Sequence, residues 1–451
     1  MLRLGPRLVI AGTHSGAGKT TVAVGLMAAL SRRGLAVASA KVGPDFIDPG
    51  YHALATGRSG RNLDAWLSGE EQLASLAGAG SDGADVLVVE GVMGLFDGSA
   101  QPGCDGSTAA VARILDCPVV LVVDASAMSG SVAALVHGFA SFDPRLEVAG
   151  VVLNRVGSEG HATLLREALA PLRIPVLGVL HHDERLAWRE RHLGLVPVAE
   201  DPAGVRRTLA CLAEVVGASC DVAALLEVAR RAAGREVPAP PSAAPAGQPV
   251  RVGLAAGAAF SFTYPENLTA LVQAGAELVP FDPLSAPALP ERLDALYAGG
   301  GFPELFGEAL AANAPLLADL RRAMTSGLVT WAECGGFLWL CRTLDGRPMA
   351  GMLPADGRMT ATLTIGYREA VTRAASPLGA AGLRLRGHEF HRSAVEPPGD
   401  GLTLTSRWGS ATAGYASPRL FASYLHQHLG ADPAPAERFV ACAASQRPVR
   451  R

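Results

Sequence analysis

The chain has 451 residues, of which 49% are apolar and 18% are charged, and its formal net charge is -3. A chain of this length usually folds as more than one domain, and the composition fits compact α/β domains rather than a disordered or fibrous protein. The net charge does not indicate the positively charged surface that binds nucleic acid, so nucleic acid is not expected as a partner. No apolar run approaches the roughly 20 residues of a transmembrane helix, so a membrane is not expected either.

The cysteines are scattered along the chain without CxxC pairs. This pattern predicts neither a disulfide framework nor a zinc site, and it is typical of proteins from a reducing compartment. The first residues lead directly into a strand-like apolar run, which leaves no room for a signal peptide. We therefore expect a cytoplasmic protein.

Short β-branched runs alternate with helix-length amphipathic stretches in the first half of the chain. The runs are Leu8–Ala11, Ala36–Lys41, Asp85–Glu90, Pro118–Asp124 and Val148–Asn154. Continuous apolar strands that alternate with helices predict a doubly wound parallel sheet, because crossover helices cover both faces of such strands. Ligands of these sheets bind beyond the carboxyl ends of the strands.

A glycine-rich loop follows the first of these strands and opens a helix. Its backbone N–H groups can surround phosphate oxygens, Lys19 supplies a positive charge, and Thr20 can bind Mg²⁺. The usual spacing places the leading glycine at position 13, and its location at Gly12 resembles the dethiobiotin-synthetase-like branch of P-loop enzymes. We expect the phosphates of ATP to bind Gly12, Thr13, Ser15, Gly16, Gly18, Lys19 and Thr20.

Polar side chains lie where several strands are expected to end near this loop. Carboxylates there can hold the Mg²⁺ that neutralises charge on phosphates, so Thr20, Asp45 and Glu90 are candidate metal ligands. Asp48 is a candidate catalytic residue that orients the substrate. Each acidic residue alone can equally be a turn or capping residue. Asn154 follows an apolar strand, and either contacts the adenine edge or caps a helix.

A segment rich in Pro and Ala, residues 235–249, separates the two halves of the chain. It lacks a hydrophobic period, so neither a helix nor ladder pairing is expected there. We predict a first domain over 1–234, a linker over 235–249 and a second domain over 250–451. An α/β rhythm restarts after the linker at Arg251–Ala255, Glu277–Pro280, Ala295–Ala298 and Leu328–Ala332.

Cys334 lies between a strand-like run that ends at Ala332 and a helix-like stretch. A cysteine alone is more often a buried packing residue. On a strand-to-helix turn, however, the side chain is exposed and the helix N-terminus favours the thiolate, which indicates a nucleophile. Backbone N–H groups of Gly300, Gly301 and Gly335 can stabilise an oxyanion formed by attack of this cysteine.

A thiol nucleophile also needs a base, and histidines occur in two places further along the chain. His426 and His428 lie near the C-terminus in a strand-like or loop context. His388 and His391 compete with them for this role. The separation in sequence is compatible with a Cys–His pair that meets in the fold.

The motifs described above, in the order in which they occur along the chain, resemble those of the cobyrinic acid a,c-diamide synthase family across essentially the whole chain. That family joins an ATP-dependent synthetase domain to a class I glutamine amidotransferase domain, and amidates two side-chain carboxylates of a corrin ring in cobalamin biosynthesis. The matching stretches are Gly12–Thr21, Lys41–Gly50, Glu90–Gly98, Glu190–Leu195, Gly299–Phe306, Glu333–Gly336, Gly387–His391 and Tyr424–His428.

The resemblance implies ATP, Mg²⁺, glutamine and a corrinoid polycarboxylate as ligands. It makes Cys334 the nucleophile and His426 the residue that raises its nucleophilicity. His428 falls where many class I glutaminases have the glutamate of the triad, and is therefore a candidate third member. We expect cobyrinate, the cobalt-containing acid, as substrate, because Lys41–Asp45 and Asn62–Asp64 resemble the branch that acts on it.

Other functions remain open at this point. Metal-free hydrogenobyrinate is the alternative acid, and cobyric acid synthase shares both domain types but amidates four positions. A deviant P-loop partitioning ATPase would leave Cys334 and His426 unexplained, and a corrinoid-binding protein without catalytic activity would not consume ATP. The assembly is also open, with a homodimer as one form considered.

Overall fold

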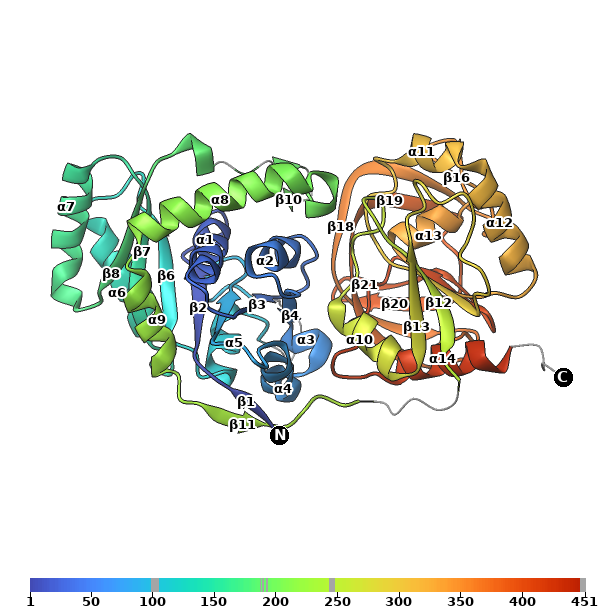
Figure 1. Cartoon of the computed structure of the whole chain (residues 1–451), viewed down its shortest axis with the longest axis horizontal. Helices are drawn as coiled ribbons and strands as arrows, with labels where there is room; N and C mark the ends of the chain where they lie inside the picture. Colours follow the sequence, from blue (N-terminus) through green and yellow to red (C-terminus); the bar gives the residue numbers. More distant parts are fainter. Residues whose placement is uncertain (99–104, 187, 189, 192–193, 243–247, 447–451) are drawn as a thin grey trace. The chain divides into compact units, whose positions relative to one another are not determined.

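The computed structural model describes residues 1–98, 105–186, 188, 190–191, 194–242 and 248–446. The chain forms two compact units, Met1–Pro240 and Pro241–Arg451 (Figure 1). Both are α/β folds. The division falls inside the segment expected to be a linker, of which residues 243–247 lie outside the described residues.

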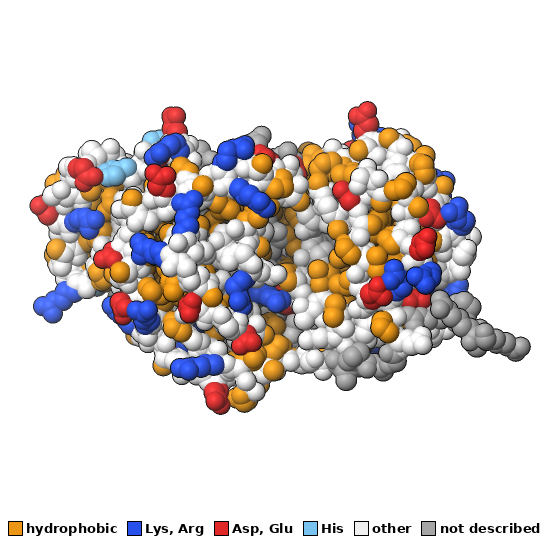
Figure 2. All heavy atoms as spheres, in the orientation of Figure 1, with side chains coloured by type: hydrophobic (Ala, Val, Ile, Leu, Met, Phe, Trp, Pro, Cys, Tyr) orange, Lys and Arg blue, Asp and Glu red, His pale blue; other side chains and the backbone are white. Residues whose placement is uncertain are grey.

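The surface carries charges of both signs. On the face that Figure 2 shows, basic and acidic side chains are interspersed on each unit. None of the described helices combines the length and the apolar composition that crossing a bilayer requires.

The first unit is built on a seven-stranded sheet in the order β4-β3-β5-β2-β6-β7-β8, in which all neighbours are parallel. β2 is central, so the loop that follows it opens at the carboxyl edge where ligands of such sheets bind. The structure confirms the five expected strands and adds β4 and β8. The strands are β2 Arg7–Gly12, β3 Val37–Val42, β4 Arg61–Leu63, β5 Val86–Glu90, β6 Val119–Asp124, β7 Val148–Val156 and β8 Val176–His181.

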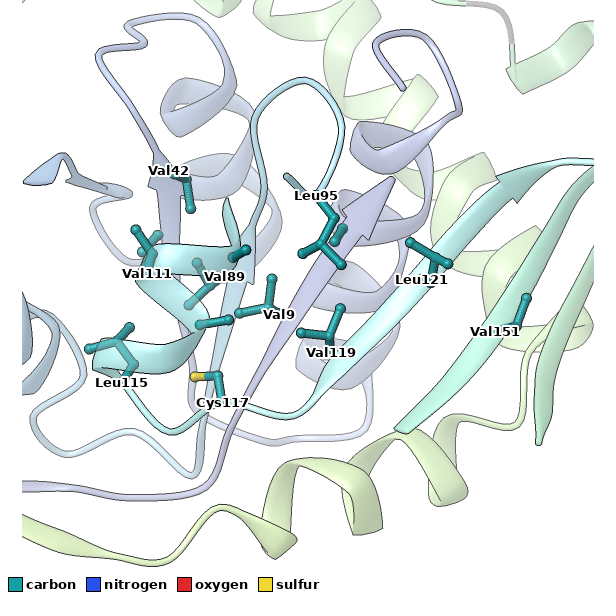
Figure 3. Packing of buried hydrophobic residues seen from close by; sticks show 14 of the residues in the cluster. Val9, Val42, Val89, Leu95, Val111, Leu115, Cys117, Val119, Leu121 and Val151 are labelled. Carbon is teal, nitrogen blue, oxygen red and sulfur yellow. The ribbon is translucent and has the colours of Figure 1, made fainter. Parts of the chain in front are cut away.

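Helices cover both faces of this sheet. Buried residues of α4 to α7 form one core cluster with the sheet, and Figure 3 shows Val9, Val89 and Leu121 among its members. No residue of α1 or α9 belongs to that cluster, although both helices contact β2, so they pack on the other face. The helices are α1 Lys19–Arg32, α2 Asp48–Thr56, α3 Ala65–Ser68, α4 Glu70–Gly80, α5 Thr108–Ile114, α6 Ser131–Phe142, α7 Glu159–Leu169, α8 Pro202–Ser219 and α9 Val222–Arg231.

Gly25 lets α1 pack closely against α8. A Cβ atom built at Gly25 would lie 2.4 Å from Cγ2 of Val216 and 3.1 Å from the carbonyl oxygen of Leu212. The helix that begins at the phosphate loop is therefore held by a backbone approach that only glycine permits.

The start of the expected linker forms a strand. Arg235–Val237 is β11, and it pairs antiparallel with β1, Leu2–Leu4. The expectation that residues 235–249 form no ladder was wrong for these three residues. The pairing can form because the first proline of the segment is Pro238, so the N–H groups of the preceding residues remain available as donors.

The second unit contains a six-stranded sheet in the order β13-β12-β14-β15-β23-β22, parallel except for the edge pair β22–β23. The four expected strands are confirmed. They are joined by two strands near the C-terminus, so that the sheet comprises β12 Val250–Ala255, β13 Ala276–Phe281, β14 Ala295–Ala298, β15 Val329–Glu333, β22 Tyr415–Ser417 and β23 Leu420–Ser423.

A further sheet in this unit was not expected from the sequence. It is dominated by the long antiparallel pair β18 and β19, and comprises β16 Thr343–Leu344, β17 Arg347–Pro348, β18 Asp356–Thr372, β19 Arg384–Glu396, β20 Leu402–Ser406 and β21 Gly409–Ala413. The helices of the unit are α10 Pro265–Gln273, α11 Gly307–Ala312, α12 Ala314–Thr325, α13 Gly335–Leu340 and α14 Ala434–Ser445.

Candidate active sites

The glycine-rich loop of the first unit adopts a conformation that suits phosphate. Gly16 and Gly18 have φ angles of 84° and 100°, which favour glycine. A Cβ atom at Gly12 would lie 2.9 Å from Cγ of Lys19, so the absence of a side chain there lets Lys19 fold back over the loop. Nζ of Lys19 donates a hydrogen bond to the carbonyl oxygen of His14 at 3.1 Å. The lysine charge thus lies against the loop that precedes it.

The environment makes Lys19 an unusually weak base. Burial, and then the positive charge of Lys41, lower the pKa of Lys19 to about 8. A polyphosphate bound in the loop would supply the negative charge that restores the protonated form.

Glu90 is the centre of a buried polar cluster beside the loop. Its Oε1 accepts hydrogen bonds from Oγ1 of Thr20 at 2.6 Å and from Nζ of Lys41 at 2.7 Å, and its Oε2 lies 2.7 Å from Nε2 of His52. Nζ of Lys41 also lies 2.6 Å from Oδ2 of Asp48. The cluster joins the end of β5, β3 and α2 directly to the phosphate loop.

Opposite charges inside this cluster hold Lys41 and Glu90 ionised. Burial alone would lower the pKa of Lys41, but the carboxylates of Asp48 and Glu90 outweigh burial and raise it. Burial would raise the pKa of Glu90, but Lys41 and His52 lower it. The pKa of Asp48 is raised by burial and by the neighbouring Asp45, so this carboxyl is the cluster's most readily protonated acid.

The candidate metal ligands are only partly brought together. Thr20 and Glu90 are in direct contact, and their oxygens are of the type that Mg²⁺ prefers when it is also bound to phosphate and water. The Oδ1 atom of Asp45 instead accepts from the backbone N–H groups of Ile47 and Asp48, at 2.7 and 3.0 Å. Among the described residues, no cluster of three or more His, Cys, Asp or Glu could hold a metal by itself.

Asn154 lies against the loop rather than capping a helix. Its Nδ2 donates to the carbonyl oxygen of Ala17 at 3.0 Å, and a Cβ atom at Gly18 would lie 2.1 Å from the same nitrogen. The side chain therefore braces the phosphate loop from β7, and contact with adenine stays a prediction.

A cleft of about 240 Å³ opens beside α2 and α8 of the same unit. Its lining includes Tyr51, Trp188 and Arg207. The two rings pack edge to face with centroids 5.0 Å apart, and Nε1 of Trp188 donates to Oγ1 of Thr21 at 2.9 Å. Because Thr21 directly follows the phosphate loop, the cleft is linked to it through one hydrogen bond. Residues 192–193, in the expected family motif nearby, lie outside the described residues.

In the second unit, Cys334 occupies a sharp turn between β15 and α13. Its φ and ψ angles are 47° and -98°, a strained conformation for a residue with a side chain. Its N–H donates to the carbonyl oxygen of Ser423 at 2.8 Å, and its own carbonyl accepts from Leu338 at 3.0 Å. Strain held by surrounding hydrogen bonds at a strand-to-helix turn is typical of a positioned nucleophile.

The thiol of Cys334 needs a base to react. Only 4% of the residue is exposed, and burial, followed by the negative charge of Glu304, raises the pKa of the thiol. The N–H group of Gly335 opposes this effect without reversing it. The expectation of an exposed side chain with a favoured thiolate was wrong, because burial outweighs the effect of the helix N-terminus. The resting residue is a thiol, and removal of its proton must accompany the attack.

Three neighbouring strands converge on this turn. β14 ends just before Gly299–Gly301, β15 ends just before Cys334, and β23 leads toward His426. A Cβ atom at Gly335 would lie 3.0 Å from the backbone nitrogen of Gly301, and one at Gly300 would lie 2.4 Å from Cε1 of His426. The expected oxyanion glycines and the expected base thus lie side by side.

His426 is enclosed by polar groups. Its Nδ1 lies 3.6 Å from Oε2 of Glu333, the residue before the nucleophile. His388 stacks on it with ring centroids 5.1 Å apart, and its Nε2 lies 2.7 Å from the hydroxyl of Tyr264. Burial, and then the neighbouring His426 and His428, hold the pKa of His388 well below its usual value, which keeps that ring neutral.

The other two histidines have different surroundings. Nε2 of His428 lies 3.6 Å from Oε2 of Glu266, and Tyr264 packs against its ring. His391 stacks on Tyr424, and its Nδ1 lies 2.9 Å from the carbonyl oxygen of Ser393. A direct role of His428 in a triad with Cys334 stays a prediction.

Three polar residues of these sites were given no role of their own from the sequence: Lys41, His52 and Glu333. Lys19 and Lys41 are the only lysines in a chain with 39 basic residues, a signal that could have linked Lys41 to the phosphate loop. His52 follows Asp48 by one helical turn, the spacing that places two side chains on one face. Glu333 is a carboxylate in an otherwise apolar strand end, directly before the nucleophile.

Family models match both units. Residues 8–196 match the CobQ/CobB/MinD/ParA nucleotide binding domain, and residues 251–434 match the CobB/CobQ-like glutamine amidotransferase domain. The first match contains the phosphate loop and the Glu90 cluster. The second contains Cys334, the glycine turn and His426.

Curated relatives match almost the whole chain. Hydrogenobyrinate a,c-diamide synthase of Streptomyces coelicolor is 49% identical, over 96% of this chain and 97% of the relative. The protein of that name from Thermobifida fusca is 48% identical, over 98% of each chain. Cobyrinate a,c-diamide synthase of Syntrophotalea carbinolica is 43% identical, over 96% of this chain and 98% of the relative. These relatives confirm the resemblance seen in the motifs.

Proposed function

Because the chain belongs to the a,c-diamide synthase family, we propose that it amidates the a and c carboxylates of a corrinoid acid, using ATP and ammonia released from glutamine. The observation that carries this proposal is the near-complete match to relatives of that name, in a chain with a phosphate loop in one unit and a nucleophile turn in the other. A partitioning ATPase would have no use for the second unit.

The first unit would activate the carboxylate. A carboxylate is a poor electrophile, so its oxygen must first become a leaving group. The carboxylate oxygen attacks the γ-phosphorus of ATP, ADP leaves, and an acyl phosphate forms. The loop amides and Lys19 would hold the phosphates, and Asp48 would orient the incoming carboxylate. Thr20 and Glu90 would hold Mg²⁺, which supplies charge neutralisation at the phosphates when bound.

The second unit would supply ammonia. Sγ of Cys334 attacks the side-chain amide carbon of glutamine while His426 takes the thiol proton. Backbone N–H groups of Gly300, Gly301 and Gly335 are proposed to stabilise the oxyanion. His426 then returns the proton to the leaving nitrogen, ammonia departs, and water hydrolyses the thioester to glutamate. Ammonia attacks the acyl phosphate carbon, and phosphate leaves as the amide forms.

The aromatic cleft beside α2 and α8 is our candidate for contact with the corrin acid. Two aromatic rings and an arginine suit a large apolar ring that carries carboxylates. Arg207→Ala should raise the KM for the corrinoid acid several-fold while leaving the KM for ATP unchanged. An unchanged KM for the acid would remove the cleft from the substrate site.

The names of the relatives bear on the choice of acid. Those at 44–49% identity are named for hydrogenobyrinate, and those at 42–43% for cobyrinate. This favours the metal-free ring, the alternative kept open above, over cobyrinate. The measurement is kcat/KM for the two acids under identical ATP and glutamine. A higher value for cobyrinate would restore the original expectation.

The general proposal is tested by mass spectrometry of the products from each acid with ATP and glutamine. We expect a diamide as the end product. A product with four new amides would indicate cobyric acid synthase, and ATP hydrolysis without any amide would contradict the proposal. A cytoplasmic location and a homodimeric assembly are further parts of the proposal, to be tested by fractionation and by light scattering.

A further inference from the structure

Among the described residues of the second unit, two of the buried His–Glu pairs have the same separation, and a third, His391 with Glu389, is longer at 3.9 Å. Nδ1 of His426 lies 3.6 Å from Oε2 of Glu333, and Nε2 of His428 lies 3.6 Å from Oε2 of Glu266. All four residues are buried. The pairs are distinguished by where they lie, because only Glu333 is adjacent in the chain to the nucleophile Cys334.

The ring of His426 has two functional edges. Nδ1 faces Glu333, whereas Cε1 and Nε2 lie toward Gly300, where an added Cβ atom would be 2.4 and 3.2 Å from them. A base in a cysteine glutaminase needs Nε2 free to accept the thiol proton, so Nδ1 must carry the other proton. A carboxylate beside Nδ1 selects that tautomer and stabilises the imidazolium that forms.

Glu333 is itself held in place from neighbouring elements. It pairs in register with Ser423 of β23, three residues before His426. The hydroxyl of Tyr297 in β14 lies 3.4 Å from Oε2 of Glu333. Asn267 of α10 braces the segment after His426, since its Nδ2 donates to the carbonyl oxygen of Gln427 at 2.8 Å. The carboxylate and the imidazole are therefore positioned by the same framework.

We propose that Glu333 is the positioning residue for His426, and so fills the role of the acidic member of the glutaminase triad, from the position before the nucleophile. This inference rests on the proposed function, which makes His426 the base. The present separation of 3.6 Å is longer than a hydrogen bond, and such contacts commonly tighten when substrate binds. Burial raises the pKa of Glu333, and His426 and the N–H of Gln427 oppose this rise only in part.

The test compares two isosteric substitutions in the full-length chain, Glu333→Gln and the matched control Glu266→Gln, with release of glutamate from glutamine as the readout. Glu333→Gln should lower kcat about 10²- to 10⁴-fold with a smaller change in KM, because the amide cannot select the tautomer. Glu333→Asp should recover part of the rate. Glu266→Gln should stay within a few-fold of the unaltered chain. Both variants should keep ammonia-dependent amidation.

The pH profile separates positioning from a purely structural effect. Glu333 and His388 are titratable groups that face His426, and the hydroxyl of Tyr297 faces Glu333. Loss of the carboxylate removes the negative charge that stabilises the imidazolium, so the acid limb of kcat/KM should move to lower pH, which a packing defect would not do. An unchanged rate for Glu333→Gln, an equal loss in both variants, or a larger loss for Glu266→Gln would overturn the proposal. Glutaminase activity absent from the unaltered chain would contradict the proposed function itself, and with it this inference.

Discussion

Because Gly300 lies against His426, replacing Gly300 by alanine tests whether the position of the His426 ring matters for catalysis. In Gly300→Ala, the new Cβ would meet Cε1 of His426 at 2.4 Å, so the ring must move. We expect glutaminase kcat to fall by about 10²-fold, since misplacement of a catalytic group by about 1 Å has that order of effect. Glutamate release measures it. Gly307→Ala is the control, because its Cβ would make only an ordinary 3.4 Å contact with Arg347. Equal rates in both variants would show that His426 is not the base.

The two lysines allow the phosphate site to be labelled selectively. Acetic anhydride reacts with neutral amines, and the pKa of about 8 for Lys19 predicts that its labelling rate rises as the pH increases to about 8 and then levels off. Lys41 should react far more slowly, because its pKa is raised and its amine stays protonated. ATP should protect Lys19 by favouring its protonated form. Peptide mass spectrometry separates both from the N-terminal amine, and a rate that ATP leaves unchanged would argue against phosphate binding at Lys19.

Two glycine substitutions in helices should change the free energy of unfolding in opposite directions, because only Gly25 lies in the close contact between α1 and α8. Gly25→Ala would place a Cβ 2.4 Å from Val216, and should lower the free energy of unfolding by about 1–3 kcal/mol. Gly138→Ala in α6 meets nothing within 4 Å, and should raise it by about 0.4–1 kcal/mol, because the unfolded chain loses freedom. Urea unfolding followed by circular dichroism measures both. Stabilisation by Gly25→Ala would contradict the close approach of the two helices.

Sequence patterns predicted the elements that are apolar and periodic. The parallel strands β2, β3, β5, β6 and β7 are continuous apolar runs, and are predictable because both faces are buried. The antiparallel pair β18 and β19 escaped prediction, because many of the residues of β18 are exposed or half-buried and its pattern lacks a clear period of two. β11 was missed because its partner, β1, lies more than 200 residues earlier in the chain, and local composition does not indicate such a distant pairing.

The same distinction applies to the candidate sites. Glycine loops, the cysteine turn and strand-end carboxylates carry local signals, so their residues could be proposed from spacing alone. The contacts of Glu333 with His426, and of His52 with Glu90, depend on which strands and helices become neighbours. Such contacts arise from tertiary packing, and spacing in the sequence does not encode them.

At the scale of the whole molecule, the proposal divides two reactions between two units. Lys19→Ala removes the loop charge, and should lower amidation by on the order of 10³-fold with either glutamine or ammonium as nitrogen source. Glutamate release without the corrinoid acid should persist, because Cys334 and His426 lie in the other unit. Product analysis and a glutamate assay on one preparation measure both. Near-normal amidation by this variant would reject the phosphate-loop assignment.

The most direct test of the central claim follows the nitrogen of glutamine. The unaltered chain and Cys334→Ser are each given ATP, glutamine labelled with ¹⁵N in its amide, and either hydrogenobyrinate or cobyrinate. The masses of the products are then measured by mass spectrometry. We predict a diamide with two ¹⁵N atoms from the unaltered chain. Cys334→Ser should give no labelled product, because a serine hydroxyl is hardly ionised near neutral pH, and should form unlabelled diamide when ammonium is added. Labelled diamide from Cys334→Ser, or no diamide from the unaltered chain with either corrinoid acid, would contradict the account.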